Sequence, residues 1–224
     1  MKSKIKIFTV SIAVLCVITT EVAAQVNLGV DIASRYVWRG ADFGNSPSIQ
    51  PDINASLGNF QIGAWAAVAT QGDPEGTEVD WYASYTFETE RSGSFQLSLT
   101  DYTFPELPTG NYFSKEAHFL EGGVGYSGPA SFPVSISTGV FFTNDDDYSV
   151  YTEIGYQVKM VNLFLGFTPA ESALYGTNKA GVINTGISAG KSLQVTELFS
   201  INLNTSIIGN PYSEDLFFVF GIGL

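Results

Sequence analysis

The feature that most constrains this chain is an alternation of apolar and polar side chains, repeated in about twelve segments. Successive side chains of a β-strand point to opposite faces, so each segment predicts a strand with one apolar and one polar face. In "VNLGVDIASRYVW", which starts at Val26, the even positions are apolar except Ser34, and the odd positions carry Asn27, Asp31 and Arg35. The segments "SIQPDINASLG" and "TEVDWYASYTFE" repeat the pattern, and further runs begin near Phe60, Phe95, His118, Val134, Tyr148, Val161, Val182, Phe199 and Leu216. Two of the runs are weak, because one breaks parity at Asp101 and the one after Val182 is rich in glycine.

The links between the segments alternate in length. "GN" at residues 58–59 and "KM" at residues 159–160 are short, whereas "TQGDPEGTE", "FPELPTGNYFSKE", "TPAESALYGTNKAG" and "GNPYSED" are long and polar. The link over residues 191–198 is an exception, since it is long for its side. Short turns at one end and long loops at the other are typical of a transmembrane β-barrel.

Composition separates a barrel from a soluble sandwich. The chain is 45% hydrophobic but only 14% charged, against about 25% charged in soluble domains. The polar parity carries mostly Ser, Thr, Asn, Gln and Gly, which suits a confined aqueous interior better than a surface in bulk water. No segment after the N-terminal 24 residues has 18 consecutive apolar residues, which excludes a helical membrane protein. An open sheet edge in lipid would leave backbone groups unpaired, so we predict an all-β fold, a single closed antiparallel transmembrane β-barrel of about 12 strands.

The N-terminus reads as a secretory signal peptide over residues 1–24, with the barrel over residues 25–224. Three early lysines precede the apolar run "IFTVSIAVLCVI", and small residues end at Ala24. The run holds the single cysteine, Cys16, so we expect no disulfide in the mature chain. Removing the leader takes away three of the 10 cations and one of the 22 acids, which leaves 7 against 21, a formal charge of −14. Such an acidic chain is unsuited to nucleic acid.

Two further features predict a location in the bacterial outer membrane. The apolar parity places aromatic residues near strand ends, where a barrel carries its interfacial girdles; they are Tyr36, Trp38, Phe60, Trp81, Phe87, Phe142, Tyr148 and Phe167. The last segment carries Leu216, Phe218, Phe220, Ile222 and Leu224 on one parity and is similar to the C-terminal signal read by the barrel-assembly machinery. The expected partners are therefore that machinery, outer-membrane lipid and lipopolysaccharide. The sequence leaves the oligomeric state open.

The stretch "SRYVWRGADFG" places two arginines among large apolar residues. On the barrel reading, Arg35 and Arg39 face the lumen while Tyr36 and Trp38 face lipid. A symmetric first hairpin sets Arg35 opposite Asp52 and Asp31 opposite Ser56. Because a buried guanidinium needs carboxylate partners, we predict a lumenal polar network of Asp31, Arg35, Arg39, Asp52, Glu78, Asp80, Glu121 and Glu153. These charges either fasten and occlude the barrel wall or take part in solute selection.

"SRYVWRG" with the following "FGNSPSIQPDI" resembles the opening strand and first loop of a family of largely uncharacterised outer-membrane proteins of Gram-negative bacteria. Members begin with an aromatic–x–aromatic–Arg–Gly stretch, which Tyr36, Trp38, Arg39 and Gly40 match. Some members are described as porins. The resemblance implies a barrel and assigns no functional residue.

No catalytic, cofactor or metal site is predicted. His118 is the only histidine, and nearby Ser114 and Glu116 are too generic to define a catalytic group. "NDDD" at residues 144–147 lacks the spacing of a calcium loop and reads as a solvated acidic loop. The chain is thus expected to be a small-solute channel or a structural protein of the outer membrane. The alternatives are a lipid-modifying hydrolase centred on His118 and a secreted β-sandwich that binds carbohydrate.

Overall fold

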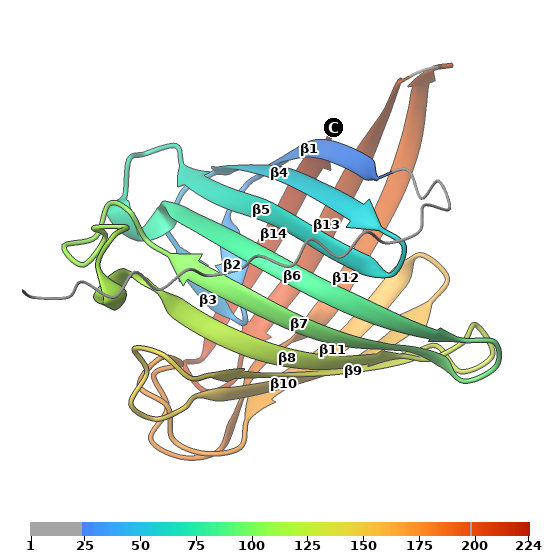
Figure 1. Ribbon diagram of the computed structural model, residues 1–224. Helices are drawn as coiled ribbons and strands as arrows, with labels where there is room; N and C mark the ends of the chain where they lie inside the picture. The colour runs from blue at the N-terminus through green and yellow to red at the C-terminus, as the bar shows by residue number, and fades with distance from the viewer. Residues whose placement is uncertain (1–23, 198) are drawn as a thin grey trace, which may run out of the picture.

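A computed structural model describes residues 24–197 and 199–224. Its main sheet is a closed antiparallel barrel of twelve strands in the order β1-β14-β13-β12-β11-β10-β9-β8-β7-β6-β5-β4 (Figure 1). The strands are β1 (Gln25–Ala33), β4 (Ser48–Leu57), β5 (Phe60–Ala69), β6 (Glu78–Thr89), β7 (Gly93–Thr103), β8 (Phe119–Ser127), β9 (Val134–Phe141), β10 (Val150–Val158), β11 (Val161–Thr168), β12 (Gly181–Thr196), β13 (Phe199–Asn210) and β14 (Asp215–Gly223). Pairing of β1 with β14, for example Ile32 with Ile222, closes the barrel. The predicted fold class is confirmed, whereas the predicted leader, apart from Ala24, lies outside the described residues.

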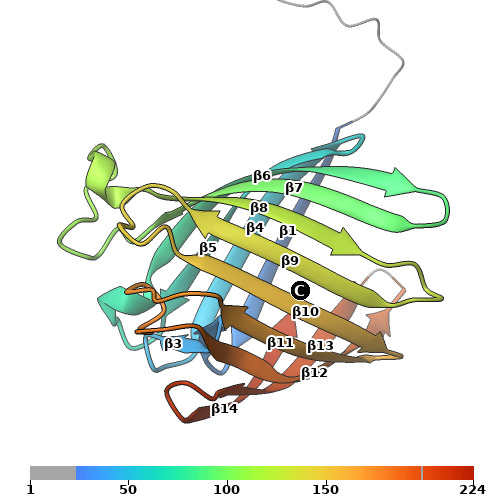
Figure 2. The same ribbon diagram turned by 90° about the horizontal axis from the view of Figure 1, so that it is seen from below.

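Two short strands, β2 (Tyr36–Trp38) and β3 (Ala41–Phe43), form a separate hairpin. The hairpin interrupts the connection from β1 to β4 and lies inside the barrel, at the end where the long loops gather (Figure 1, Figure 2). Its turn is Arg39–Gly40, with φ of 50° and 80°. Positive φ at both central residues is the geometry of a tight two-residue hairpin turn. The chain therefore folds a plug into its own lumen before the second barrel strand begins.

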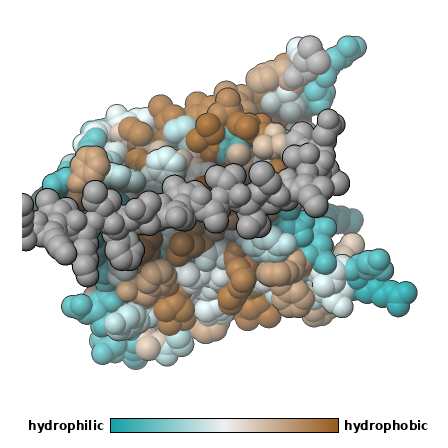
Figure 3. Space-filling model, viewed as in Figure 1, coloured by the Kyte–Doolittle hydropathy of each residue, from teal (hydrophilic) through white to brown (hydrophobic). Residues whose placement is uncertain are grey.

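The outer surface of the strands is apolar and exposed. Leu28, Leu97 and Phe218 are 77%, 52% and 65% exposed. In Figure 3, hydrophobic residues gather over the middle of the visible strands, and hydrophilic residues lie toward the two ends. Within the described part of the chain, no helix is long and apolar enough to cross a membrane; the helical turns are η1 (Pro74–Gly76) and η2 (Lys115–Ala117).

The opposite parity points into the lumen, and polar side chains and glycines predominate there. Its glycines include Gly29, Gly63, Gly123, Gly125, Gly139, Gly155, Gly166, Gly186, Gly190, Gly221 and Gly223. Some of them make room for a large neighbour, since a Cβ at Gly139 would lie 2.5 Å from the Glu121 carboxylate and one at Gly166 would lie 2.1 Å from the Tyr151 hydroxyl. The lumen therefore contains polar side chains and cavities rather than a packed apolar core.

Buried apolar side chains gather at the loop end instead. Among the described residues they are Tyr36, Ala67, Ala69, Tyr102, Ala117, Phe141, Tyr151 and Ile183. Most of them come from the loop ends of wall strands and surround the hairpin. Burying a large apolar side chain contributes about 1.5–3 kcal/mol, so the aromatic residues of the hairpin supply the driving force for its inward position.

The inward hairpin overturns the predicted register of the first two barrel strands. Asp52 lies opposite Gly29 rather than Arg35, and Asp31 lies opposite Gln50 rather than Ser56. The prediction was wrong because β1 ends at Ala33, and the hairpin takes up residues that a continuous strand would have used.

The same early end of β1 overturns the lipid-facing placement of Tyr36 and Trp38. Tyr36 is only 7% exposed, and the Trp38 ring lies 5.6 Å from the inward Tyr102 ring. Other members of the predicted girdle do lie on the outside; Phe60, Trp81, Phe87, Phe142 and Tyr148 are exposed.

Two other expectations about strand ends also change. The weak run after Val182 belongs to β12, the longest strand, which extends to Thr196. The link to β13 is therefore short, like the other links on its side. The segment "GNPYSED" shortens to a four-residue turn over 211–214, because β13 continues to Asn210 and β14 begins at Asp215. Backbone pairing needs no apolar side chain, so hydropathy alone underestimates both elements.

Candidate functional site: the hairpin and its latch

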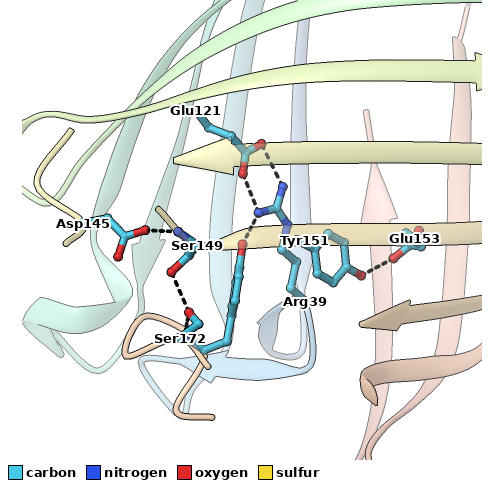
Figure 4. Close-up of polar contacts among 8 residues, drawn as sticks. Arg39, Glu121, Asp145, Ser149, Tyr151, Glu153 and Ser172 are labelled. Carbon is cyan, nitrogen blue, oxygen red and sulfur yellow. Dashed lines mark hydrogen bonds and ion pairs between the residues drawn. The ribbon is translucent and has the colours of Figure 1, made fainter. Parts of the chain in front are cut away.

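Arg39 projects from the hairpin turn to the barrel wall (Figure 4). Its two terminal nitrogens donate to the two carboxylate oxygens of Glu121 on β8, at 2.5 and 2.9 Å. Nη1 also donates to the hydroxyl of Tyr175, at 2.5 Å, in the loop between β11 and β12. The side chains of Arg39 and Glu121 are 14% and 9% exposed. A two-point contact of this kind fixes orientation as well as distance, so it latches the hairpin to the wall.

Aromatic rings enclose the same guanidinium. Its carbon lies 4.5 Å from the centre of the Trp38 ring and 4.4 Å from that of Tyr151. Such contacts contribute about 0.5–2 kcal/mol each, more when water is excluded. Burial raises the pKa of the Tyr175 hydroxyl to about 12, so this loop phenol is neutral at physiological pH. The latch is therefore one cation balanced by one carboxylate inside an aromatic enclosure.

Further hydrogen bonds extend from Tyr151 into the lumen. The Tyr151 hydroxyl donates to Glu153 at 2.5 Å and accepts from the Asn184 amide at 2.8 Å. The same amide also approaches Glu153, at 3.1 Å. These contacts join β10 to β12 behind the arginine and hold the Tyr151 ring in place for the guanidinium.

Gly40 and Asn210 secure the other side of the turn. The side-chain amide of Asn210 donates to the backbone oxygen of Gly40 at 3.2 Å. A Cβ at Gly40 would lie 1.9 Å from the backbone oxygen of Ile183 on β12. Only glycine lets the turn approach the wall this closely, and its φ of 80° also favours glycine.

A buried acidic pair lies on the opposite side of the hairpin. The Tyr36 hydroxyl donates to Glu78 at 2.9 Å. Glu78 and Asp80, both inward on β6, are 2% and 7% exposed. Within the described residues neither has an ion pair, and Asp80 Oδ1 has no hydrogen-bond partner.

The remaining predicted residues lie apart from the latch. Arg35 pairs with Asp42 in the hairpin rather than with Asp52. Asp52 accepts from the Tyr82 hydroxyl at 2.8 Å and from the Asn54 amide at 2.7 Å. Asp31 lines a separate cavity of about 340 Å³. The predicted network is thus several clusters, and the one that links hairpin to wall centres on Arg39, not on Arg35.

Cavities flank the hairpin on several sides. One of about 210 Å³ is lined by Arg39, Glu121, Glu153 and lumenal glycines and serines. Another, of about 270 Å³, is mostly apolar and opens among the loops, between Trp38 and Tyr102 of the interior and Phe104 and Leu107 of the β7–β8 loop. The hairpin therefore separates the lumenal cavity of about 210 Å³ from the cavity of about 270 Å³ among the loops.

The loops at this end are tied together by the residues of "NDDD". The Asn144 amide donates to the backbone oxygen of His118 at 2.9 Å. Asp145 accepts from the backbone nitrogen of Ser149 at 2.5 Å, and Asp147 from that of Ala173 at 2.7 Å. Across residues 24–197 and 199–224, no three His, Cys, Asp or Glu side chains cluster in a way that could hold a metal ion.

His118 lies at the rim, between η2 and the first residue of β8. One ring nitrogen is 2.8 Å from Asp101 Oδ2 and the other is 2.7 Å from the backbone oxygen of Tyr112. Both partners can only accept, which favours the doubly protonated ring. The carbonyl of Tyr112, followed by the carboxylate of Asp101, raises the pKa of His118. Asp101, which broke the parity of its segment, is therefore the partner of this histidine.

Comparison with known proteins places the chain in a family. The family model described as "Bacterial protein of unknown function (Gcw_chp)" matches residues 19–171. The chain belongs to this family. The matched region of this Gcw_chp protein includes the hairpin, the Glu78–Asp80 pair and Glu121, and it ends before Tyr175. The predicted membership of an uncharacterised bacterial family is confirmed to that extent, and the role of "SRYVWRG" as its signature stays a prediction.

Other comparisons add little. No curated protein matches the sequence. Among solved structures, the outer membrane phospholipase A from Escherichia coli is similar over 88% of this chain and 86% of that chain, with 11% identity and a TM-score of 0.36. A score of this size establishes no common fold, and the activity in that name belongs to that protein.

The interpretation of the sequence missed the inward roles of Trp38, Tyr151, Tyr175 and Asn184. One local signal was present for the hairpin, since Arg39–Gly40 is a residue-plus-glycine turn flanked by Trp38 and Ala41, which pair directly. No local signal marked Tyr175, which lies in a loop 136 residues from Arg39.

Proposed function

We propose that this protein is a β-barrel of the bacterial outer membrane that conducts small solutes, cations in preference to anions, when its internal hairpin is released. The observation that carries the proposal is the latch: Arg39 holds the hairpin to Glu121 between lumenal cavities and the loop end. A hairpin used only as wall material would not need to lie inside a polar lumen.

The apolar exterior supports the membrane location. Side chains such as Leu28, Leu97 and Phe218 would be exposed to water in a soluble protein, and monomeric soluble proteins rarely expose large contiguous apolar patches. A closed barrel leaves no unpaired edge in hydrocarbon. We propose outer-membrane lipid and lipopolysaccharide as the surroundings of this face, and residues 1–24 as a leader for export.

The last strand supports assembly in that membrane. On β14, Leu216, Phe218 and Phe220 are 74%, 65% and 58% exposed along one face. We propose that this strand, up to Leu224, engages the barrel-assembly machinery. Because a soluble sandwich turns its apolar parity toward a second sheet, the closed barrel with this parity outside disfavours the secreted carbohydrate-binding alternative.

The charges of the lumen support cation preference. Six carboxylates of the predicted network are inward, namely Asp31, Asp52, Glu78, Asp80, Glu121 and Glu153. The hairpin arginines Arg35 and Arg39 are each paired with an acid. Rings of acidic side chains favour cations in a pore.

Planar-bilayer recording of the refolded protein tests the proposal. In a potassium chloride gradient the expected reversal potential has the sign of cation selectivity. Asp31→Asn together with Asp52→Asn should reduce that selectivity, whereas Glu90→Gln, in an exposed turn, should leave it unchanged. Anion selectivity, or no conductance in the wild type and in a latch-breaking variant, would contradict the proposal.

We also propose that His118 is not a catalytic base. A base needs an unprotonated nitrogen within reach of its substrate, and both ring nitrogens of His118 face oxygen acceptors. In a strain whose lipid profile changes when the protein is deleted, His118→Ala should restore the profile as fully as the wild type. Failure of His118→Ala to do so, at equal barrel abundance, would favour the hydrolase alternative.

A further inference from the structure

A fourth cavity combines aromatic rings with a carboxylate, which is the composition of a site for an organic cation. It has a volume of about 260 Å³ and lies between the hairpin and the barrel wall, with Tyr36, Trp38, Trp65, Tyr82 and Tyr102 as its aromatic walls and Asp80 and Thr100 as its other lining residues. Since a water molecule occupies about 30 Å³ in the liquid, the cavity has room for a solute of several heavy atoms. Its walls consist mostly of aromatic rings, whose faces and phenol oxygens are the groups available to a ligand.

The carboxylate of this cavity has no cation of its own. Asp80 is only 7% exposed, and its Oδ1 lacks a hydrogen-bond partner. The ion pairs of the described chain use other acids, namely Asp42, Glu121 and Asp101. Asp80 is hydrogen-bonded to Glu78, so the two carboxyl groups share a proton, and the negative charge that remains on the pair has no cation beside it. Burying a charge without a counter-ion is costly, so a ligand that brings a positive charge would be favoured here.

An inorganic cation fits these walls poorly. Alkali and alkaline-earth ions prefer shells of oxygen ligands, whereas five of the lining residues are aromatic. Substituted ammonium ions are instead recognised by aromatic rings together with a carboxylate, because the face of each ring is electronegative. The composition of the cavity therefore favours an organic cation.

The route to the cavity carries a second acid. Trp38 and Tyr102 line both this cavity and the apolar cavity of about 270 Å³ among the loops. Glu78 lines the loop cavity, and Asp80 lines the cavity of about 260 Å³. The two acids occupy successive inward positions of β6 and are hydrogen-bonded to each other, so the pair connects the two cavities.

We propose that the cavity walled by Tyr36, Trp38, Trp65, Tyr82 and Tyr102 binds a small substituted ammonium ion, with Asp80 as its counter-ion. The inference rests on the proposed function, because the cation must reach the cavity through the barrel. The inference also names a class of solute for the proposed channel. Glu78 supplies a first attraction from the loop side.

Equilibrium binding to the detergent-refolded full chain tests this inference without conduction. The probe is choline chloride, and the neutral comparison is 3,3-dimethylbutan-1-ol, which has the same shape without the charge. Tryptophan fluorescence reports occupancy, since Trp38 and Trp65 line the cavity. We expect saturable quenching by choline and binding of the neutral compound weaker by roughly tenfold or more.

Two variants and one control locate the site. Asp80→Asn, which keeps the shape of the side chain, should weaken choline binding by roughly tenfold or more, while Asp31→Asn, which changes an acid of another cavity, should not. Trp65→Leu should weaken binding with the carboxylate intact. Folding of each variant is checked by heat-modifiable migration in detergent gels.

The outcomes separate this inference from the proposed channel. Equal binding of choline and its neutral analogue, displacement of choline by equimolar potassium, or unchanged binding in folded Asp80→Asn would each overturn the inference. Choline binding without conductance in any variant would overturn only the channel, and cation conductance without choline binding would overturn only the ammonium site.

Discussion

Replacing Arg39 by Met removes the charge of the latch and keeps much of the side-chain volume. The Glu121 side chain, 9% exposed, is then left as a buried carboxylate without its partner. Removing one partner of a buried ion pair costs about 3–5 kcal/mol. Loss of the cation–π contacts with Trp38 and Tyr151 adds about 0.5–2 kcal/mol for each ring. The lower figure alone shifts hairpin docking toward the released state by more than about a hundredfold, since 1.4 kcal/mol is a factor of ten.

Single-channel recording measures this shift as open-state occupancy. Arg39→Met should raise occupancy strongly, and Arg39→Met with Glu121→Gln should lie closer to wild type because no unpaired charge remains. Arg91→Met is the matched control, since Arg91 is an exposed arginine in the β6–β7 turn. Equal occupancy in wild type and folded Arg39→Met, or additive effects of the two latch changes, would refute the latch.

Three other perturbations probe the turn, the wall and the rim. Gly40→Ala should release the hairpin, because its Cβ would meet a backbone oxygen at 1.9 Å. The control Gly72→Ala is also at positive φ but has nothing within 4 Å of the added Cβ, so it should leave open-state occupancy unchanged. Equal occupancy in the two variants would argue against the close approach of the turn to β12. Leu97→Arg, at an outward position that is 52% exposed, should destabilise the barrel in lipid vesicles by about 2–4 kcal/mol, measured by urea unfolding. The inward control Ser98→Arg should destabilise it less. A larger loss of stability in Ser98→Arg than in Leu97→Arg would contradict the assigned faces. His118, the single histidine, should titrate by NMR above its ordinary pKa of about 6.5. Its contribution to the free energy of unfolding is then full below pH 6.5 and is lost as pH rises through the folded pKa. A pKa at or below about 6.5 would contradict the proposal that both ring nitrogens donate hydrogen bonds.

The barrel itself could be predicted because its physics is local. The two faces of each strand meet different environments, so every strand segment shows the alternation of apolar and polar residues. Asp101 departs from the alternation because its carboxylate pairs with His118. Strand ends were less predictable. In β12 the lumenal glycines weaken the hydropathy signal, although backbone pairing with β11 and β13 runs along the strand.

The hairpin escaped prediction because its parity imitates a strand. Tyr36 and Trp38 continue the apolar alternation of β1, so periodicity alone extends that strand into the lipid face. What distinguishes them is long-range packing: Tyr36 meets Trp65 at 5.3 Å between ring centres, and Trp38 meets Phe141 at 6.3 Å. The sequence could name Arg39 and Glu121 as inward charges, but their pairing joins positions 82 residues apart.

The three tryptophans allow a direct test of the central claim, that the hairpin lies inside a barrel whose apolar face meets hydrocarbon. Trp81 is outward and 49% exposed, whereas Trp38 and Trp65 line an internal cavity. The measurement is fluorescence quenching by brominated acyl chains in vesicles, with three variants that each keep one tryptophan. The account predicts strong quenching of Trp81 and little of Trp38 or Trp65; quenching of Trp38 as strong as that of Trp81 would place the hairpin in the lipid-facing wall and contradict the account.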